Sequence, residues 1–153
     1  MKYLLQTILM RSQKVQNTKN LTIQSLKSLK EDTAGIVYAI LQLKRGDEYH
    51  YKRFESYNRT VRGYGRINIE DYDFKGAFQL ETGETETAHL LEEIFRFWNM
   101  PARPSWIRFT MPFTGHSLSV SDIVALYQDN KIRFFFCDRF GFKELINETI
   151  PIT

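Results

Sequence analysis

Residues 113–145 read FTGHSLSVSDIVALYQDNKIRFFFCDRFGFKEL and predict a β-hairpin. Two runs within this stretch are rich in β-branched and aromatic residues, as strands are: 122–128 and 131–137. The dipeptide Asp129-Asn130 between them tolerates positive φ angles, which a tight hairpin turn requires. A further turn that ends at Gly141 precedes a short last strand. The stretch therefore favours an antiparallel sheet.

The polar residues of the same stretch resemble the parts of a Ser-His-Asp active site. A nucleophilic serine needs a histidine within hydrogen-bonding reach and an acid that orients this histidine. His116 and Ser117 are neighbours, however, and neighbouring side chains of an extended chain point to opposite faces. Ser119 and Asp122 precede the first strand, where their side chains can bond local backbone groups. We favour the hairpin interpretation and assign no catalytic residue.

Length and composition indicate one globular domain, with or without an appendage. The chain has 153 residues, of which 42% are hydrophobic, enough for a packed core. No apolar run approaches the ~20 residues that span a bilayer, so neither a membrane partner nor a secretory signal is expected. The single cysteine, Cys137, favours a cytoplasmic protein. No metal-ligand spacing or glycine-rich phosphate loop is present, so we expect no metal and no cofactor.

Basic residues are concentrated at the N-terminus. Residues 1–30 contain six Lys or Arg and no acid, whereas residues 31–153 have a net charge of −3. Such an asymmetry suggests a polyanionic partner or an intramolecular clamp. Weak helical patterns occur at 3–15 and 21–32, and Gly35 could end the second in a left-handed conformation. We therefore expect a basic helical arm over 1–34 and an α+β domain over 35–153.

The fold class expected for the domain is α+β, either a curved antiparallel sheet or a small open barrel. One amphipathic helix, at 87–99 with Thr87 as its N-cap, packs on this sheet. The other expected elements are a strand buried on both faces at 35–43, strands at 49–54 and 75–80, an exposed loop at 57–74, and a Pro-punctuated segment at 101–115 whose aromatic residues fill the core.

Arginine and tyrosine alternate in the stretch YNRTVRGYGR, at Tyr57, Arg59, Arg62, Tyr64 and Arg66. Arginine offers a planar fork to phosphates, and tyrosine can stack on bases. The same two residue types are enriched at the centres of protein interfaces. The composition therefore leaves three interpretations open: a nucleic-acid contact, a protein interface or a plain solvated loop.

Four stretches together resemble the YodL-like family, small domains of Firmicutes found in proteins of mobile genetic elements. They are VYAILQLKRGDEYHYKRFESY, LEEIFRFWNM, GHSLSVSDIVAL and CDRFGFKEL, and the resemblance covers about 36–145. Its most specific part is the turn and hairpin motif formed by His116, Ser117, Ser119, Asp122, Asp138 and Gly141. Two features depart from the family: residues 1–34 have no counterpart, and RTVRGYGR is more basic than the usual connection.

The resemblance implies a mobile-element protein that modulates a host protein, and it carries over no catalytic residue. Our leading hypothesis is an inhibitor of the anti-CRISPR or antirestriction type, which binds a host defence nuclease or its guide RNA. Glu70, Asp71 and Asp73 could imitate phosphates, while the three arginines of 57–66 could hold RNA. The alternatives are a metal-independent ribonuclease that trims RNA, and a regulatory module that binds a cytoskeletal or chromosomal protein.

Overall fold

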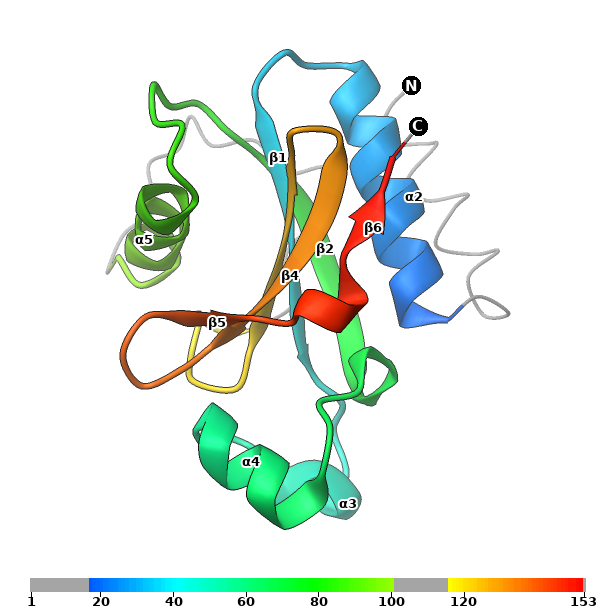
Figure 1. Ribbon diagram of the computed structural model, residues 1–153, viewed down its shortest axis with the longest axis vertical. Helices are drawn as coiled ribbons and strands as arrows, with labels where there is room; N and C mark the ends of the chain where they lie inside the picture. Colours follow the sequence, from blue (N-terminus) through cyan, green and yellow to red (C-terminus); the bar gives the residue numbers. More distant parts are fainter. Residues whose placement is uncertain (1–16, 101–115, 153) are drawn as a thin grey trace.

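The chain folds around one antiparallel sheet (Figure 1). The computed structural model describes residues 17–100 and 116–152. The strands are β1 (Ile36–Leu43), β2 (Tyr72–Leu80), β3 (Ile123–Gln128), β4 (Lys131–Cys137), β5 (Phe142–Glu144) and β6 (Ile150–Pro151). Their order is β2-β1-β3-β4-β5, and β6 pairs with the start of β4. The sheet is open, which confirms the α+β class and selects the curved sheet over the barrel.

Helices cover both faces of the sheet and one of its ends (Figure 1). They are α2 (Thr18–Glu31), α3 (Asp47–His50), α4 (Tyr57–Tyr64) and α5 (Thr87–Trp98), with 3-10 turns η2 (Ile69–Asp71) and η3 (Ile146–Glu148). The helix predicted at 87–99 is thereby confirmed. The predictions of a helix at 3–15 and of a core-filling segment at 101–115 lie outside the described residues.

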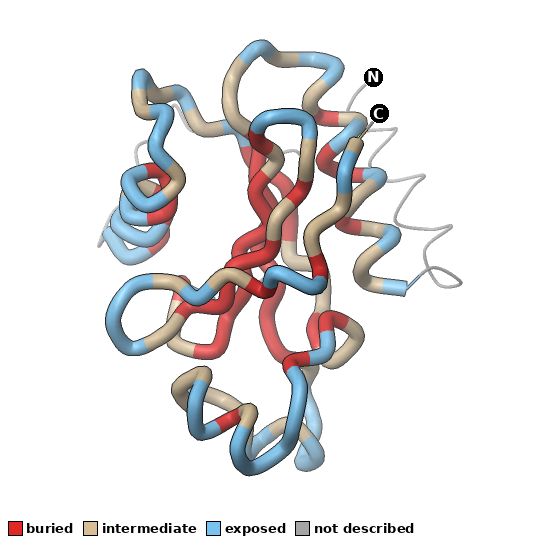
Figure 2. The backbone as a smooth tube through the Cα atoms, viewed as in Figure 1, coloured by how far each residue is buried: buried red, intermediate tan, exposed pale blue. Residues whose placement is uncertain are grey.

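The central strand β1 is apolar throughout because it lies between two cores. Its alternate residues Val37 and Ala39 face α2, which contributes Leu26 and Leu29 to that core. The residues between them face α5, whose Leu90, Leu91, Ile94 and Trp98 form the second core. Buried residues accordingly follow the middle of the sheet, and exposed residues lie on the helices and turns around it (Figure 2). The prediction of a strand buried on both faces is confirmed.

The predicted hairpin of β3 and β4 is also confirmed. Its two turn residues, Asp129 and Asn130, have φ angles of 55° and 59°, and Gln128 pairs with Lys131 across the turn. Positive φ at both central positions matches the right-handed twist of the flanking strands. Gly141, with a φ of 76°, allows the next turn, which joins β4 to β5.

Two expectations for residues 47–74 are wrong. The strand predicted at 49–54 is helix α3 followed by turns, because Gly46 with a φ of 136° breaks the chain direction after β1. Asp47 and Glu48 then favour a helix start, where negative charge is stabilising. The exposed loop predicted at 57–74 contains α4, η2 and the first residues of β2. The Ser56 hydroxyl caps α4 by accepting from the Arg59 N–H at 3.3 Å.

Both predicted helix boundaries also require correction. Thr87 is the first residue of α5 rather than its N-cap, and its hydroxyl is bound instead to the Gln128 side chain at 3.0 Å. Helix α2 ends at Glu31, four residues before Gly35, and Asp32 closes it with its backbone N–H bonded to the Leu29 and Lys30 carbonyls. The last turn of α2 therefore needs no left-handed residue.

Acidic residues of the sheet domain hold the N-terminus of α2. The Glu70 carboxylate accepts from the backbone N–H groups of Thr18 at 2.7 Å and Lys19 at 3.1 Å. The Lys19 ammonium lies 2.7 Å from the Glu148 carboxylate. These contacts place α2 on the sheet as part of the same core, and they neutralise one of the basic charges of the N-terminal region.

Candidate functional site

Residues of the turn and hairpin motif converge at one end of the sheet, around the side chain of Gln42. The Gln42 amide is buried, donates to the His116 carbonyl at 2.9 Å and to Asp122 Oδ2 at 3.1 Å, and accepts from the His116 N–H at 3.2 Å. Asp122 Oδ2 also accepts from the Ser119 N–H at 2.8 Å. We call these four residues the sheet-end network. Sequence reasoning missed Gln42, although an amide within the apolar run IVYAILQL was the signal.

The hydrogen bonds of the network organise a turn rather than a nucleophile. His116 Nδ1 lies 2.6 Å from the Ser117 carbonyl oxygen and 3.1 Å from the Gln42 amide nitrogen, so the imidazole is held by the turn and by the buried amide. Asp122 Oδ2 lies 3.8 Å from the same nitrogen, beyond hydrogen-bonding distance. The Ser119 hydroxyl donates to the Ser117 carbonyl at 3.2 Å. The relay that activates a serine, from acid to histidine to hydroxyl, is not the arrangement of these groups.

Burial changes the acidity of the groups in and around the network. Burial raises the pKa of Asp122 to about 7, against the lowering effects of the Ser119 N–H, the Gln42 amide and the Arg53 charge. Burial and then the nearby Asp122 charge raise the pKa of Cys137 to about 12. The thiol of Cys137 is therefore protonated at neutral pH, and nucleophilic thiolate chemistry is disfavoured there. Asp122, by contrast, titrates near neutrality.

Ser121 and the motif residue Asp138 position the segment 47–64, which we call the α3–α4 cap. The Ser121 hydroxyl accepts from the Phe54 N–H at 3.1 Å, and the Tyr72 hydroxyl donates to the Ser121 carbonyl at 2.7 Å. Asp138 Oδ1 accepts from the Tyr57 N–H at 3.2 Å, at the start of α4. Ser121 and Asp138 thus join the hairpin end to the cap, and side chains on α4 are presented from a fixed base.

The five predicted binding residues divide into two groups. Arg59, Arg62 and Tyr64 line an exposed hollow of about 570 Å³, together with Tyr51, Glu55 and Gly63. We call these six residues the α4 face. Tyr57 instead packs edge-on against Phe136 at 5.8 Å, and Arg66 forms an ion pair with Glu148 at 2.8 Å. Tyr51 was missed because 49–54 was interpreted as a strand.

Charge on the α4 face is weakly neutralised. Arg59 is 69% exposed and lies 3.4 Å from Glu55 in an i,i+4 pair, a contact of small energetic weight. Tyr51 and Tyr64 are 69% and 49% exposed, and the Lys52 ammonium lies 5.4 Å from the centre of the Tyr64 ring. Arginine forks beside accessible aromatic rings are suited to phosphates and stacked bases.

The model of the YodL-like domain family matches residues 37–147. The chain belongs to this family. Neither the curated proteins nor the solved structures yield a match. Within the YodL-like chain, the matched range includes the whole sheet-end network and the α4 face, whereas α2 precedes it.

The structure describes residues 17–100 and 116–152 of the YodL-like chain. No helix there is long and apolar enough to cross a membrane. Across these same residues, no three His, Cys, Asp or Glu side chains are grouped so that they could hold a metal ion.

Proposed function

We propose that this YodL-like protein inhibits a host defence nuclease by binding its guide RNA through the α4 face. The proposal rests on one observation: two arginines, Arg59 and Arg62, share an exposed hollow with two accessible tyrosine rings. Arginine binds phosphate oxygens with a bidentate fork, and each base that stacks on an aromatic ring adds about 1–3 kcal/mol. The face combines both contributions on one helix and its neighbouring turn.

The position of the α4 face favours inhibition by covering the guide RNA. Its base is fixed by the bonds from Asp138 to Tyr57 and from Ser121 to Phe54, so binding orders little backbone. The family resemblance implies a mobile-element setting. We therefore propose that the partner is a nuclease that attacks foreign DNA. Covering its guide would block target pairing without any chemistry by the inhibitor.

Phosphate imitation by the acidic stretch 70–73 is the weaker route to the same inhibition. The Glu70 carboxylate already binds two backbone N–H groups of α2, and Asp71 lies 3.1 Å from the Lys52 ammonium. Carboxylates engaged in this way would have to break internal contacts before they met a partner. The proposal therefore assigns recognition to the basic α4 face.

The test uses the double variant Arg59→Glu, Arg62→Glu. Wild-type protein should bind a labelled single-stranded RNA of about 12 nucleotides and inhibit cleavage by a purified RNA-guided nuclease. The double variant should bind this RNA at least tenfold more weakly. Loss of two phosphate contacts should also reduce the slope of log affinity against log salt by roughly 1.4. Inhibition should fall in parallel.

A matched control reverses two exposed charges elsewhere, with Lys27→Glu on α2 and Arg45→Glu after β1. This control has the same net charge as the double variant, so it should keep most of the RNA affinity if recognition is local. Wild-type affinity in the Arg59/Arg62 variant would overturn the assignment of the α4 face. Shortened RNA after incubation with the protein would instead establish the ribonuclease alternative.

A further inference from the structure

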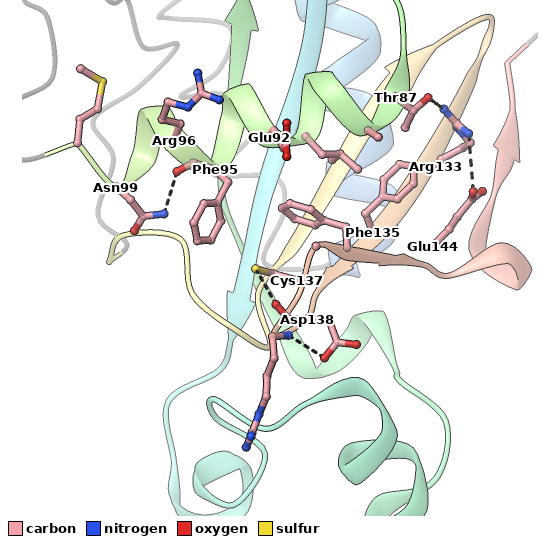
Figure 3. A pocket seen from close by; sticks show the side chains of 16 residues that line it. Thr87, Glu92, Phe95, Arg96, Asn99, Arg133, Phe135, Cys137, Asp138 and Glu144 are labelled. Carbon is pink, nitrogen blue, oxygen red and sulfur yellow. Dashed lines mark hydrogen bonds and ion pairs between the residues drawn. The ribbon is translucent and has the colours of Figure 1, made fainter.

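A groove of about 960 Å³ lies on the other side of the molecule from α2, between α5 and the β4–β5 hairpin (Figure 3). Its apolar wall is formed by Leu91 and Phe95 of α5 and by Phe135 and Phe142 of the hairpin. The Phe95 and Phe142 rings meet edge to face, with centres 6.4 Å apart. Within the described residues, a helix and a hairpin thus leave an apolar channel open between them, and it takes no part in the proposed RNA contact.

A large apolar side chain projects beside this groove. Phe140 is 97% exposed, more than any other large hydrophobic residue of the described chain. It lies at the tip of the β4–β5 turn, between Arg139 and Gly141, which both line the groove. Hydrogen bonds at 2.9 Å, from the Asp138 N–H to the Gly141 carbonyl and from the Arg139 N–H to Asp138 Oδ1, fix the tip. The ring is therefore held in water on an ordered turn.

Charges around the groove are balanced in sign. Three cations and three anions line it: Arg96, Arg133, Arg139, Glu92, Asp138 and Glu144. A partner with a strong net charge would meet as many like charges as opposite ones. Arg133 and Glu144 already face each other at 3.7 Å within one copy. A second copy of the same surface, turned about a two-fold axis, can place the other cations near the other anions. A projecting side chain and a groove on one surface can also fit the groove and the side chain of a second copy across such an axis.

We infer that the protein self-associates as a two-fold dimer in which each Phe140 ring enters the α5–hairpin groove of the other copy. The occupant of the groove is thus defined chemically as a second copy of this chain. Both contacts form together, since the two-fold axis makes them equivalent. Burial of two aromatic rings in apolar channels supplies the anchors that small interfaces depend on.

Two single variants, measured by sedimentation equilibrium, test this dimer. Phe140→Ser removes the projecting side chain and keeps the groove, whereas Phe95→Ser removes a groove wall and keeps the projecting side chain. Each change acts twice in a dimer, so each should weaken self-association about 100-fold or more. Ile146→Ser, which changes a residue 72% exposed outside the groove lining, is the matched control and should leave self-association unchanged.

An equimolar mixture of the two variants separates the proposed contact from a general loss of surface hydrophobicity. In the mixed dimer, the intact groove of Phe140→Ser can accept the intact Phe140 of Phe95→Ser, which restores one of the two contacts. The mixture should therefore associate about tenfold or more tightly than either variant alone. Circular dichroism checks that both variants stay folded.

A protein that stays monomeric up to about 1 mM would overturn the inference. So would open-ended growth instead of a closed dimer, and so would a mixture that associates no better than its components. Because the groove and the α4 face share no residue, the Arg59/Arg62 double variant should dimerise normally. Failure of the RNA proposal would thus leave this one standing, and the reverse holds.

Discussion

The sheet-end network and the α4 face are connected through the cap, yet they differ in how many hydrogen-bond and ion-pair partners their polar side chains have. In the network, the buried amide of Gln42 has partners on both His116 and Asp122. On the α4 face, the side chain of Arg59 makes a loose contact with Glu55, and both flanking tyrosine rings are open to solvent. Buried polar groups that have hydrogen-bond partners stabilise a fold, whereas exposed charged groups with few internal contacts can bind a partner molecule. Changes in the two regions should therefore alter different measurements.

Gln42→Leu should produce the largest change in stability. The substitution leaves Asp122 Oδ2 with one described donor fewer and removes the amide from both the N–H and the carbonyl of His116. Unsatisfied buried polar groups cost about 1–3 kcal/mol each, so urea unfolding should show a loss of about 3 kcal/mol. Gln79→Leu, on an exposed position of β2, is the control and should change stability by less than about 0.5 kcal/mol. A loss as large in the control would show that any leucine on the sheet has this effect.

Asp122 should make the protein less stable as the pH rises. Its pKa is about 7 in the folded chain and close to 3.8 when unfolded, so the folded state binds more protons between these values. The stabilisation is present at acidic pH and lost as the pH rises through 7. Between pH 5 and pH 8 the loss should be about 2–3 kcal/mol, as measured by urea unfolding at each pH. Asp122→Asn should remove this dependence, and an unchanged dependence in that variant would assign it to another group.

The hairpin and the two helices on the sheet faces were predictable because local signals agreed with tertiary structure. Asp129-Asn130 requires no distant partner to make its turn, and the apolar spacing of α5 matches the face that it buries. Residues 47–64 were not predictable in the same way. Alternating Tyr and Arg residues there resemble a strand or a loop, and the short helices depend on the Ser56 cap and on Gly46.

The candidate site shows the same division. Clustering of His116, Ser119 and Asp122 could be expected from their spacing. Gln42, which bridges His116 and Asp122, lies 74 positions before His116, and its role was therefore not visible in the sequence. The basic composition of 57–66 was visible in the sequence. Its division into exposed and engaged residues was not, since Glu148 and Phe136 approach from distant parts of the chain.

Arg66 and Arg59 belong to one predicted RNA-binding set, yet only Arg59 lies on the α4 face, whereas Arg66 is paired with Glu148. Burial opposes ionisation of Glu148, but hydrogen bonds from Lys19 and Arg66 outweigh it and lower the pKa of Glu148. Arg66→Ala should therefore reduce stability by up to about 1 kcal/mol, a small value because the arginine is largely exposed. Its RNA affinity should match that of the wild type, since Arg66 lies outside the hollow.

Arg59→Ala should do the reverse, with stability within about 0.5 kcal/mol of the wild type and RNA affinity reduced about fivefold. Fluorescence anisotropy with the labelled RNA and urea unfolding give both quantities for each variant. Equal losses of affinity in the two variants would show that RNA extends past the end of α4 to Arg66, and the binding surface would then include all three arginines. A stability loss confined to Arg66→Ala, with affinity lost only in Arg59→Ala, would establish that adjacent basic residues serve a structural clamp and a binding face separately.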